Sequence, residues 1–275
     1  MNLPLNNFIR VKILDLARGT DQWEVYKRYL KNQYEYTRKD ISHYQEIHFE
    51  QIVRHHLERN SAYRKFLAQN GYRERPDIFP SDIPVITKDF FRDNPGNHFV
   101  KDEVQIVKHS GGTTGMPLPI HLSKAAVDNF WPSIWRAFNV YNIQPCDKMM
   151  MIAGPSLFNN RSFQRRVYDM DNRFTVLSAF DLSADRLEQA YLFMLKHHIK
   201  VIYGYTSSIL IFLDFLEKND LRLNLKCIFT TSETFIPAVR RLARSFCNCD
   251  VVDTYGANDG GVFGFECSHH SGYHL

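Results

Sequence analysis

The chain has 275 residues and a mass of 32.3 kDa, and 44% of its residues are hydrophobic. This composition excludes a disordered chain and predicts one large globular domain or two smaller ones. The 34 basic and 30 acidic residues give a formal net charge of +4 without a long block of like charge. The charge pattern therefore argues against a nucleic-acid-binding protein and favours a small-molecule partner.

The cysteines and the apolar runs indicate the compartment. Five cysteines, an odd number scattered over a large chain, suit a reducing compartment better than a disulfide framework. The N-terminus has no apolar segment followed by a cleavage site, and the longest apolar run, ILIFLDFL, contains Asp214 and is too short to span a bilayer. We expect a cytoplasmic protein without membrane insertion, and we also consider a homodimer.

The first 75 residues show helical spacing of apolar side chains, for example at Phe49, Ile52 and Val53. Four prolines between residues 76 and 95 then mark an irregular segment, in which DIPVITKDFFRDN predicts one short helix. Residues 1–100 are therefore expected to form a helical lead-in, and residues 101–275 an α/β part of the same large domain, to which the motifs described below assign nucleotide binding.

From Val104 onward, short β-rich runs alternate with amphipathic stretches. VQIVKH and PLPIHL predict two strands on either side of a glycine-rich turn. A helix is expected after Ser123, its cap, with Pro132 kinking or interrupting it. Further strands and helices predict a mostly parallel sheet that helices cover on both faces. The strands are KMMMIA, FTVLSAF, KVIYGY, KCIFTTSE and DVVDTYG, and the helices lie at 183–198, 207–219 and 235–246.

The glycine-rich turn, SGGTTG at 110–115, crowds small and hydroxyl-bearing residues together. Its backbone N–H groups and hydroxyls are donors suited to phosphate, although an ordinary polar hairpin loop has the same composition. The turn joins two strands and lacks the Gly-Lys-Ser/Thr ending, so a P-loop NTPase is excluded.

Polar residues follow three of the predicted parallel strands. Because the carboxyl ends of parallel strands meet at one edge, these residues and the turn predict a crevice for a nucleoside triphosphate. Tyr255 would lie against the base, and a carboxylate would bind Mg²⁺. The three strand ends are Gly204-Tyr205-Thr206, Thr231-Ser232-Glu233-Thr234 and Asp253-Thr254-Tyr255-Gly256-Ala257-Asn258-Asp259.

These motifs resemble those of adenylate-forming ligases. Residues 110–117 are similar to the Thr/Ser-rich phosphate loop of that superfamily, Tyr255-Gly256-Ala257-Asn258-Asp259 to its Tyr-Gly-x-Thr-Glu motif, and Thr231-Ser232-Glu233 to its nucleotide-binding turn. The ending FEC through GYH resembles the phenylacetate–CoA ligase-like branch, which includes the CapK capsular polysaccharide biosynthesis proteins.

The resemblance implies ATP-dependent carboxylate activation. A carboxylate would attack the α-phosphate of ATP, pyrophosphate would leave, and the acyl-adenylate would pass to coenzyme A or another acceptor. It assigns Mg²⁺ to Asp259, one methylene shorter than the family glutamate. The phosphate donors would be Ser110, Gly111, Gly112, Thr113, Thr114 and Gly115. The other nucleotide contacts would be Ser232, Glu233, Thr234, Asp253, Tyr255, Gly256 and Asn258. Asn258 replaces the threonine that is usual at this position of the family motif.

Each assignment has a structural alternative. Ser232 and Glu233 could instead cap the helix that follows them, and Tyr255 could be a core residue. The acyl pocket is assigned to Trp135, Phe138, Gly204 and Tyr205, but the run FWPSIWRAF also suits a buried helix face.

A second candidate site is a structural Zn²⁺ held by Cys249, Cys267 and His274, because thiolate and imidazole are suitable zinc ligands. Against it, the cysteines do not form a CxxC pair, and free cysteines are commonly buried small apolar residues.

The sequence stops at Leu275, soon after the Tyr-Gly motif. The small C-terminal domain of such ligases, with its ribose-binding aspartate and catalytic lysine, is therefore expected to be absent, and catalysis by these residues alone to be weak. The alternative is a non-catalytic nucleotide-binding or interaction protein on the same scaffold. An α/β-hydrolase is excluded because GPSLF lacks the second glycine of the nucleophile elbow.

Overall fold

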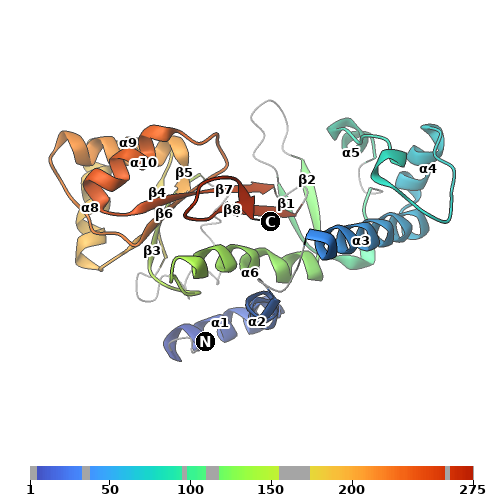
Figure 1. Cartoon of the computed structure of the whole chain (residues 1–275), viewed down its shortest axis with the longest axis horizontal. Coiled ribbons are helices and arrows are strands. Elements are labelled where there is room, and N and C mark those ends of the chain that lie inside the picture. Colours follow the sequence, from blue (N-terminus) through green and yellow to red (C-terminus); the bar gives the residue numbers. More distant parts are fainter. Residues whose placement is uncertain are drawn as a thin grey trace. The chain divides into compact units, whose positions relative to one another are not determined.

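A computed structural model describes residues 5–32, 38–94, 98–109, 118–154, 174–257 and 261–274. The chain divides into two compact units. Unit 1 comprises residues 1–26 and 128–275, and unit 2 comprises residues 27–127. Figure 1 shows the elements of both units, coloured along the sequence. Within the described ranges, none of the helices combines the length and the apolar composition needed to cross a bilayer.

Unit 1 is built on a seven-stranded sheet with the order β4-β3-β5-β6-β7-β8-β9. The first five strands in this order pair in parallel, and β8 and β9 add to the sheet in antiparallel pairs. The sheet is therefore mostly parallel, as the sequence predicted. The strands are β3 (Met149–Ala153), β4 (Phe174–Ser178), β5 (Val201–Tyr205), β6 (Cys227–Thr231), β7 (Asp250–Ala257), β8 (Val262–Glu266) and β9 (Tyr273–His274).

One face of this sheet packs against three helices, which Figure 1 shows lying together over the strands. They are α8 (Ala184–Lys196), α9 (Thr206–Lys218) and α10 (Pro237–Leu242), the last continued by one π-helical turn, η3 (Ala243–Cys247). Alternate strand residues such as Ile152, Ile202 and Ile228 join the apolar side chains of these helices in one fully buried cluster. Because successive side chains of a strand point to opposite faces, the intervening residues, which are also buried in β3 and β6, lie on the other face.

The opposite face packs against α6 (Lys124–Val140). The Phe138 ring lies 6.1 Å from that of Tyr203 and 4.5 Å from that of Phe229. Two further helices, α1 (Leu5–Arg18) and α2 (Gln22–Asn32), belong to this side, where the rings of Tyr26 and Trp135 are 5.7 Å apart. Helices thus cover both faces, which confirms the expected fold class.

The start of α6 agrees with the sequence, but its interior does not. The Ala126 N–H donates to Ser123 Oγ at 3.3 Å, as expected for a cap. Pro132, however, lies inside an uninterrupted helix. Proline removes one backbone donor but need not end a helix whose neighbours are buried, and Ile134, Trp135 and Phe138 anchor the following turns in the core.

Unit 2 contains helices and one hairpin. Its elements are α3 (Arg38–Arg59), α4 (Ser61–Gln69), η1 (Pro80–Asp82), α5 (Lys88–Asp93), η2 (Lys101–Glu103), β1 (Val104–His109) and β2 (Pro119–Ser123). Asn60 caps α4 by accepting the Tyr63 N–H at 3.0 Å. The two strands pair in antiparallel fashion, which confirms the predicted hairpin.

Two partly buried histidines of unit 2 predict that the stability of this unit falls at acidic pH. The His121 ring stacks on Phe99 with centroids 3.6 Å apart, and burial, His98 and His109 lower its pKa. Burial and His55 lower the pKa of His56. A lowered folded-state pKa means that the unfolded chain binds more protons, so unit 2 loses stability as the pH falls below about 6.5, the ordinary histidine value.

We therefore expect the thermal midpoint of the chain to fall on acidification through this window, and the fall to shrink in His121→Asn and His56→Asn. His43→Asn, at an exposed position, is the control and should keep the wild-type pH dependence. Equal pH dependence in all four proteins would contradict the prediction.

Candidate functional site

The carboxyl ends of β5, β6 and β7 lie at the same edge of the sheet. β5 pairs with β6 up to Tyr205 and Thr231, and β6 pairs with β7 up to Thr230 and Asp253. The structure therefore brings together the three strand ends that the sequence singled out. Crevices at this edge are where open α/β sheets bind ligands.

The end of β7 is divided between buried and exposed side chains. Asp253 and Thr254 are buried, whereas the Tyr255 side chain is 56% exposed. Tyr255 is thus not a core residue, and its ring lies 6.4 Å from that of Tyr273. An exposed aromatic ring at this edge can serve as a stacking surface for a planar base.

Asp253 has its oxygens committed to neighbouring side chains. Thr230 Oγ1 donates to its Oδ1 at 2.6 Å, and the Tyr273 hydroxyl donates to its Oδ2. This second hydrogen bond, followed by burial, raises the pKa of Tyr273 to about 12. Asp253 therefore fixes β6, β7 and β9 to one another, a role that the sequence did not indicate.

Glu233 binds the beginning of α9. Its carboxylate accepts the Ser207 N–H at 2.7 Å and the Ser207 hydroxyl at 3.0 Å. Capping chemistry was the alternative that the sequence allowed, but the capped helix is α9 and not α10, which begins after Ile236 without a side-chain cap. Ser232, which directly precedes Glu233, adopts a φ of 68°. This left-handed conformation is costly for a residue other than glycine.

Glu233→Ala is expected to lower the free energy of unfolding by about 1 kcal/mol, because two donors at the N-terminus of α9 lose their acceptor. Glu233→Gln keeps an acceptor oxygen and should cost less. Urea denaturation followed by circular dichroism measures the difference. Equal stability of the alanine variant and the wild type would show that this cap contributes nothing.

The ends of β3, β4 and β5 gather a second group of residues. A Cβ added to Gly154 would lie 3.0 Å from the Phe180 ring and 3.3 Å from the Tyr205 hydroxyl, so both side chains border this glycine. Phe180 is largely exposed. The sequence did not single out Phe180 or Gly154 as site residues, because neither belongs to the nucleotide-binding motifs.

The predicted acyl-pocket residues occupy different environments. Trp135 and Phe138 are buried on the α6 side of the sheet, packed against Tyr26 and Phe229 respectively. Gly204 lies in β5, where an added Cβ would be 2.1 Å from the Ile152 carbonyl oxygen. Tyr205 alone of the four lies at the strand ends beside Gly154.

The structure gives no support to a zinc site. Cys249 and Cys267 are free, and no group of three or more His, Cys, Asp or Glu side chains in the described part of the chain could hold a metal ion. Burial is the main cause that raises the pKa of Cys249, which disfavours the thiolate that zinc requires. Cys249 belongs to the buried helix-covered cluster, whereas His274 is exposed on β9.

Two predicted groups lie outside the described residues. These are the phosphate donors Ser110, Gly111, Gly112, Thr113, Thr114 and Gly115, and the pair Asn258 and Asp259. The described strands β1 and β2 flank the first group, and β7 leads into the second.

A polar network behind β7 was also not anticipated. Glu266 of β8 accepts hydrogen bonds from Arg240 Nη2 at 2.8 Å and from the Asp253 N–H at 3.1 Å. His270 contacts Glu266 at 3.1 Å and Asp250 at 3.0 Å. The network joins α10, β7, β8 and the segment after β8. Its members are far apart in sequence, so no local pattern announces it.

The chain resembles solved acyl-CoA ligases in fold. It matches 2-hydroxyisobutyryl-CoA ligase in an open conformation in complex with 2-HIB-AMP and CoA, with 17% identity and a TM-score of 0.57, over 76% of this chain and 48% of that one. It also matches the postadenylation state of that enzyme in complex with 2-HIB-AMP, with 17% identity and a TM-score of 0.57, over 76% and 46%.

The chain also matches 2-hydroxyisobutyryl-CoA ligase in the thioesterification state, in complex with 2-HIB-AMP and CoA. The identity is 18% and the TM-score 0.50, over 74% of this chain and 46% of that one. No protein-family model and no curated protein sequence matches. The chain spans less than half the length of these ligase structures. Its mixed α/β fold with a mostly parallel, helix-covered sheet therefore resembles the fold of about half of 2-hydroxyisobutyryl-CoA ligase.

Proposed function

We propose that this chain is the nucleotide-binding part of an ATP-dependent carboxylate-activating ligase. The substrate carboxylate attacks the α-phosphate of ATP, the bond to the β-phosphate breaks, and pyrophosphate leaves. The acyl-adenylate then reacts with coenzyme A or another acceptor, and AMP is released. The protein positions the reactants and neutralises charge on the leaving group.

The observation that carries this proposal is the exposed Tyr255 ring at the carboxyl end of β7, beside the Ser232-Glu233 turn that follows β6. Both belong to motifs that resemble the nucleotide-binding motifs of adenylate-forming ligases, and the fold similarity to ligase structures with bound acyl-adenylate supports the same assignment. Tyr255 stacks on the adenine, and Gly256 lets the base approach the backbone.

The remaining contacts follow from the sequence motifs. Backbone N–H groups and hydroxyls of Ser110 to Gly115 bind the phosphates, Asn258 contributes a polar contact, and Asp259 holds Mg²⁺ directly or through water. Gly154, Tyr205 and Phe180 border the region where the carboxylate substrate binds. The CapK-like branch, a cytoplasmic location and a homodimer belong to this proposal as well.

A second candidate function is a nucleotide-binding or interaction protein that keeps the scaffold without catalysing adenylation. It is favoured by one observation, the commitment of Asp253 and Glu233 to structural hydrogen bonds. Both carboxylates hold neighbouring elements of this chain together, which is a structural role that needs no catalysis.

Exchange of labelled pyrophosphate into ATP tests the proposal. With a broad panel of carboxylic acids, we expect at least one acid to stimulate weak but measurable exchange by this chain, and Thr114→Val to reduce it further because a phosphate donor is lost. Binding of MgATP without exchange for any acid would overturn the ligase proposal in favour of the second candidate. Absence of both binding and exchange would overturn the ligase proposal and the nucleotide-binding form of the second candidate, and would leave an interaction protein on the same scaffold.

A further inference from the structure

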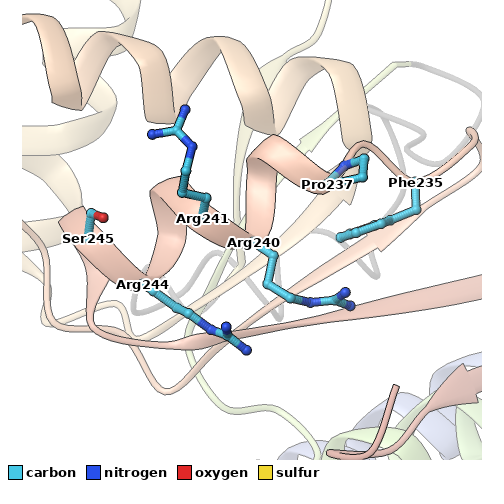
Figure 2. Close-up of a pocket in the computed structure, with 6 residues that line it drawn as sticks. All are labelled: Phe235, Pro237, Arg240, Arg241, Arg244 and Ser245. Atoms are coloured by element: carbon cyan, nitrogen blue, oxygen red, sulfur yellow. The ribbon is translucent and has the colours of Figure 1, made fainter. Parts of the chain in front are cut away.

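A second concave site is lined by residues of α10, η3 and the segment that leads from β6 into α10. A cavity of about 500 Å³ opens on this face of unit 1, and Figure 2 shows the side chains around it. Its charged lining residues are all arginines, and no acidic side chain lines it. The lining residues are Phe235, Pro237, Arg240, Arg241, Arg244 and Ser245.

Two of the arginines have weak partners. Arg241 lies 3.8 Å from a Glu217 oxygen and Arg244 lies 3.8 Å from an Asp250 oxygen, and their side chains are 66% and 64% exposed. These distances exceed a hydrogen bond, and exposed ion pairs of this kind contribute little. Most guanidinium donors of both residues therefore face water and are available to an anion.

Arg240 is held in place instead. Its Nη2 donates to Glu266 at 2.8 Å and to the Val251 carbonyl at 3.2 Å, and its guanidinium lies 4.4 Å from the centroid of the Phe235 ring. Its buried Nε has no hydrogen-bond partner among the described residues. The contacts of Nη2 and Phe235 thus fix the direction of the Arg240 guanidinium, whose positive charge lies beside the cavity.

The helix brings two of these side chains to one side. Arg240 and Arg244 are four residues apart, a spacing that places side chains next to each other on a helical surface. In Figure 2 both extend to the same side of the ribbon, whereas Arg241 extends toward the opposite side. One ligand group can therefore contact Arg240 and Arg244 together, with the Phe235 ring beside it.

We propose that this cavity binds a phosphate monoester that carries a planar apolar group. A phosphate monoester has nearly two negative charges and three acceptor oxygens, which match paired guanidinium groups better than a single carboxylate does. Phe235 and Pro237 supply the apolar wall for the attached group, and the volume suits a small molecule. The proposal rests on these arginines and Phe235 and does not depend on the proposed ligase activity.

Isothermal titration of the chain with phenyl phosphate, inorganic phosphate and benzoate tests the proposal. We expect phenyl phosphate to bind more tightly than either of the others, because it alone combines the phosphate charge with a ring for Phe235. Arg244→Gln should weaken this binding about tenfold, because it removes one charge-assisted contact. Arg244 is exposed and weakly paired, so the variant should fold normally.

Arg92→Gln is the matched control. The Arg92 side chain on α5 is 49% exposed, lies 3.0 Å from Asp89, and is not among the residues that line the cavity. This control variant should bind phenyl phosphate as the wild type does, both with and without excess ATP in the calorimeter cell. The proposal is overturned if phenyl phosphate does not bind, if Arg244→Gln binds it unchanged, or if both arginine variants weaken it equally. Equal affinities for phenyl phosphate and inorganic phosphate would also overturn the proposal, because they would show an anion site without a pocket for the attached group.

Discussion

Replacing Gly204 with alanine is expected to lower the free energy of unfolding by at least about 3 kcal/mol, because β5 is central and cannot move aside. The added Cβ would lie 2.1 Å from the Ile152 carbonyl oxygen and 2.9 Å from the carbonyl carbon of the same residue. β3 lies on one side of β5 and β6 on the other, and both are buried. Relief of the clash therefore requires breaking backbone hydrogen bonds of the parallel sheet.

Gly256→Ala is the control for this substitution. A Cβ there meets nothing closer than 3.8 Å, which is ordinary contact distance, so the variant should match or exceed wild-type stability. Urea denaturation of the three proteins, followed by circular dichroism, gives the comparison. Stability of Gly204→Ala within about 1 kcal/mol of the wild type would mean that β3 and β5 do not pair as described.

Glu266→Ala is expected to cost about 3 kcal/mol of unfolding free energy, because it leaves a partly buried arginine charge without its carboxylate. Glu266 is mostly buried, and it accepts from Arg240 at 2.8 Å and from the Asp253 N–H at 3.1 Å. The substitution leaves the Asp253 N–H without this acceptor, removes the carboxylate that lies 2.8 Å from Arg240 and removes a contact of His270. Glu266→Gln retains an acceptor but not the charge, and its stability should fall between the two.

Glu217→Gln provides the comparison for Glu266. Glu217 lies 3.8 Å from Arg241 and both side chains are about half exposed or more, so its loss should change stability by less than about 0.5 kcal/mol. The same denaturation experiment measures all four proteins. If Glu266→Ala were no less stable than Glu217→Gln, the network behind β7 would have no energetic role.

The sequence predicted the parallel part of the sheet well because its strands are short apolar runs separated by helical patterns. The predicted segments KVIYGY and KCIFTTSE contain β5 and β6, and the helices predicted at 183–198 and 207–219 became α8 and α9. The edge at which the strand ends meet followed from the parallel arrangement alone. Strand β8 and the two-residue strand β9 were missed, because the polar segment CSHHSGY between them carries no strand signal.

Interactions between distant residues were the least predictable part. Ser207 and Glu233 are 26 positions apart, and Arg240 and Glu266 are likewise 26 apart, so neither pair leaves a local pattern. Spacing could not distinguish a helix face from a ligand pocket at Trp135 and Phe138, because both environments are apolar. The cavity beside Arg240 depends on the direction in which three arginines extend, which the motif PAVRRLARS does not encode.

The central claim is that the carboxyl edge of the sheet binds a nucleotide through Tyr255, and the affinity for MgATP tests it most directly. We expect the wild-type chain to bind MgATP and Tyr255→Ala to bind at least about tenfold more weakly, because stacking of a base on an aromatic ring is lost. Tyr44→Ala is the control, since Tyr44 on α3 is 55% exposed compared with 56% for Tyr255. Absence of MgATP binding, or equal affinities of the wild type and Tyr255→Ala, would contradict the claim.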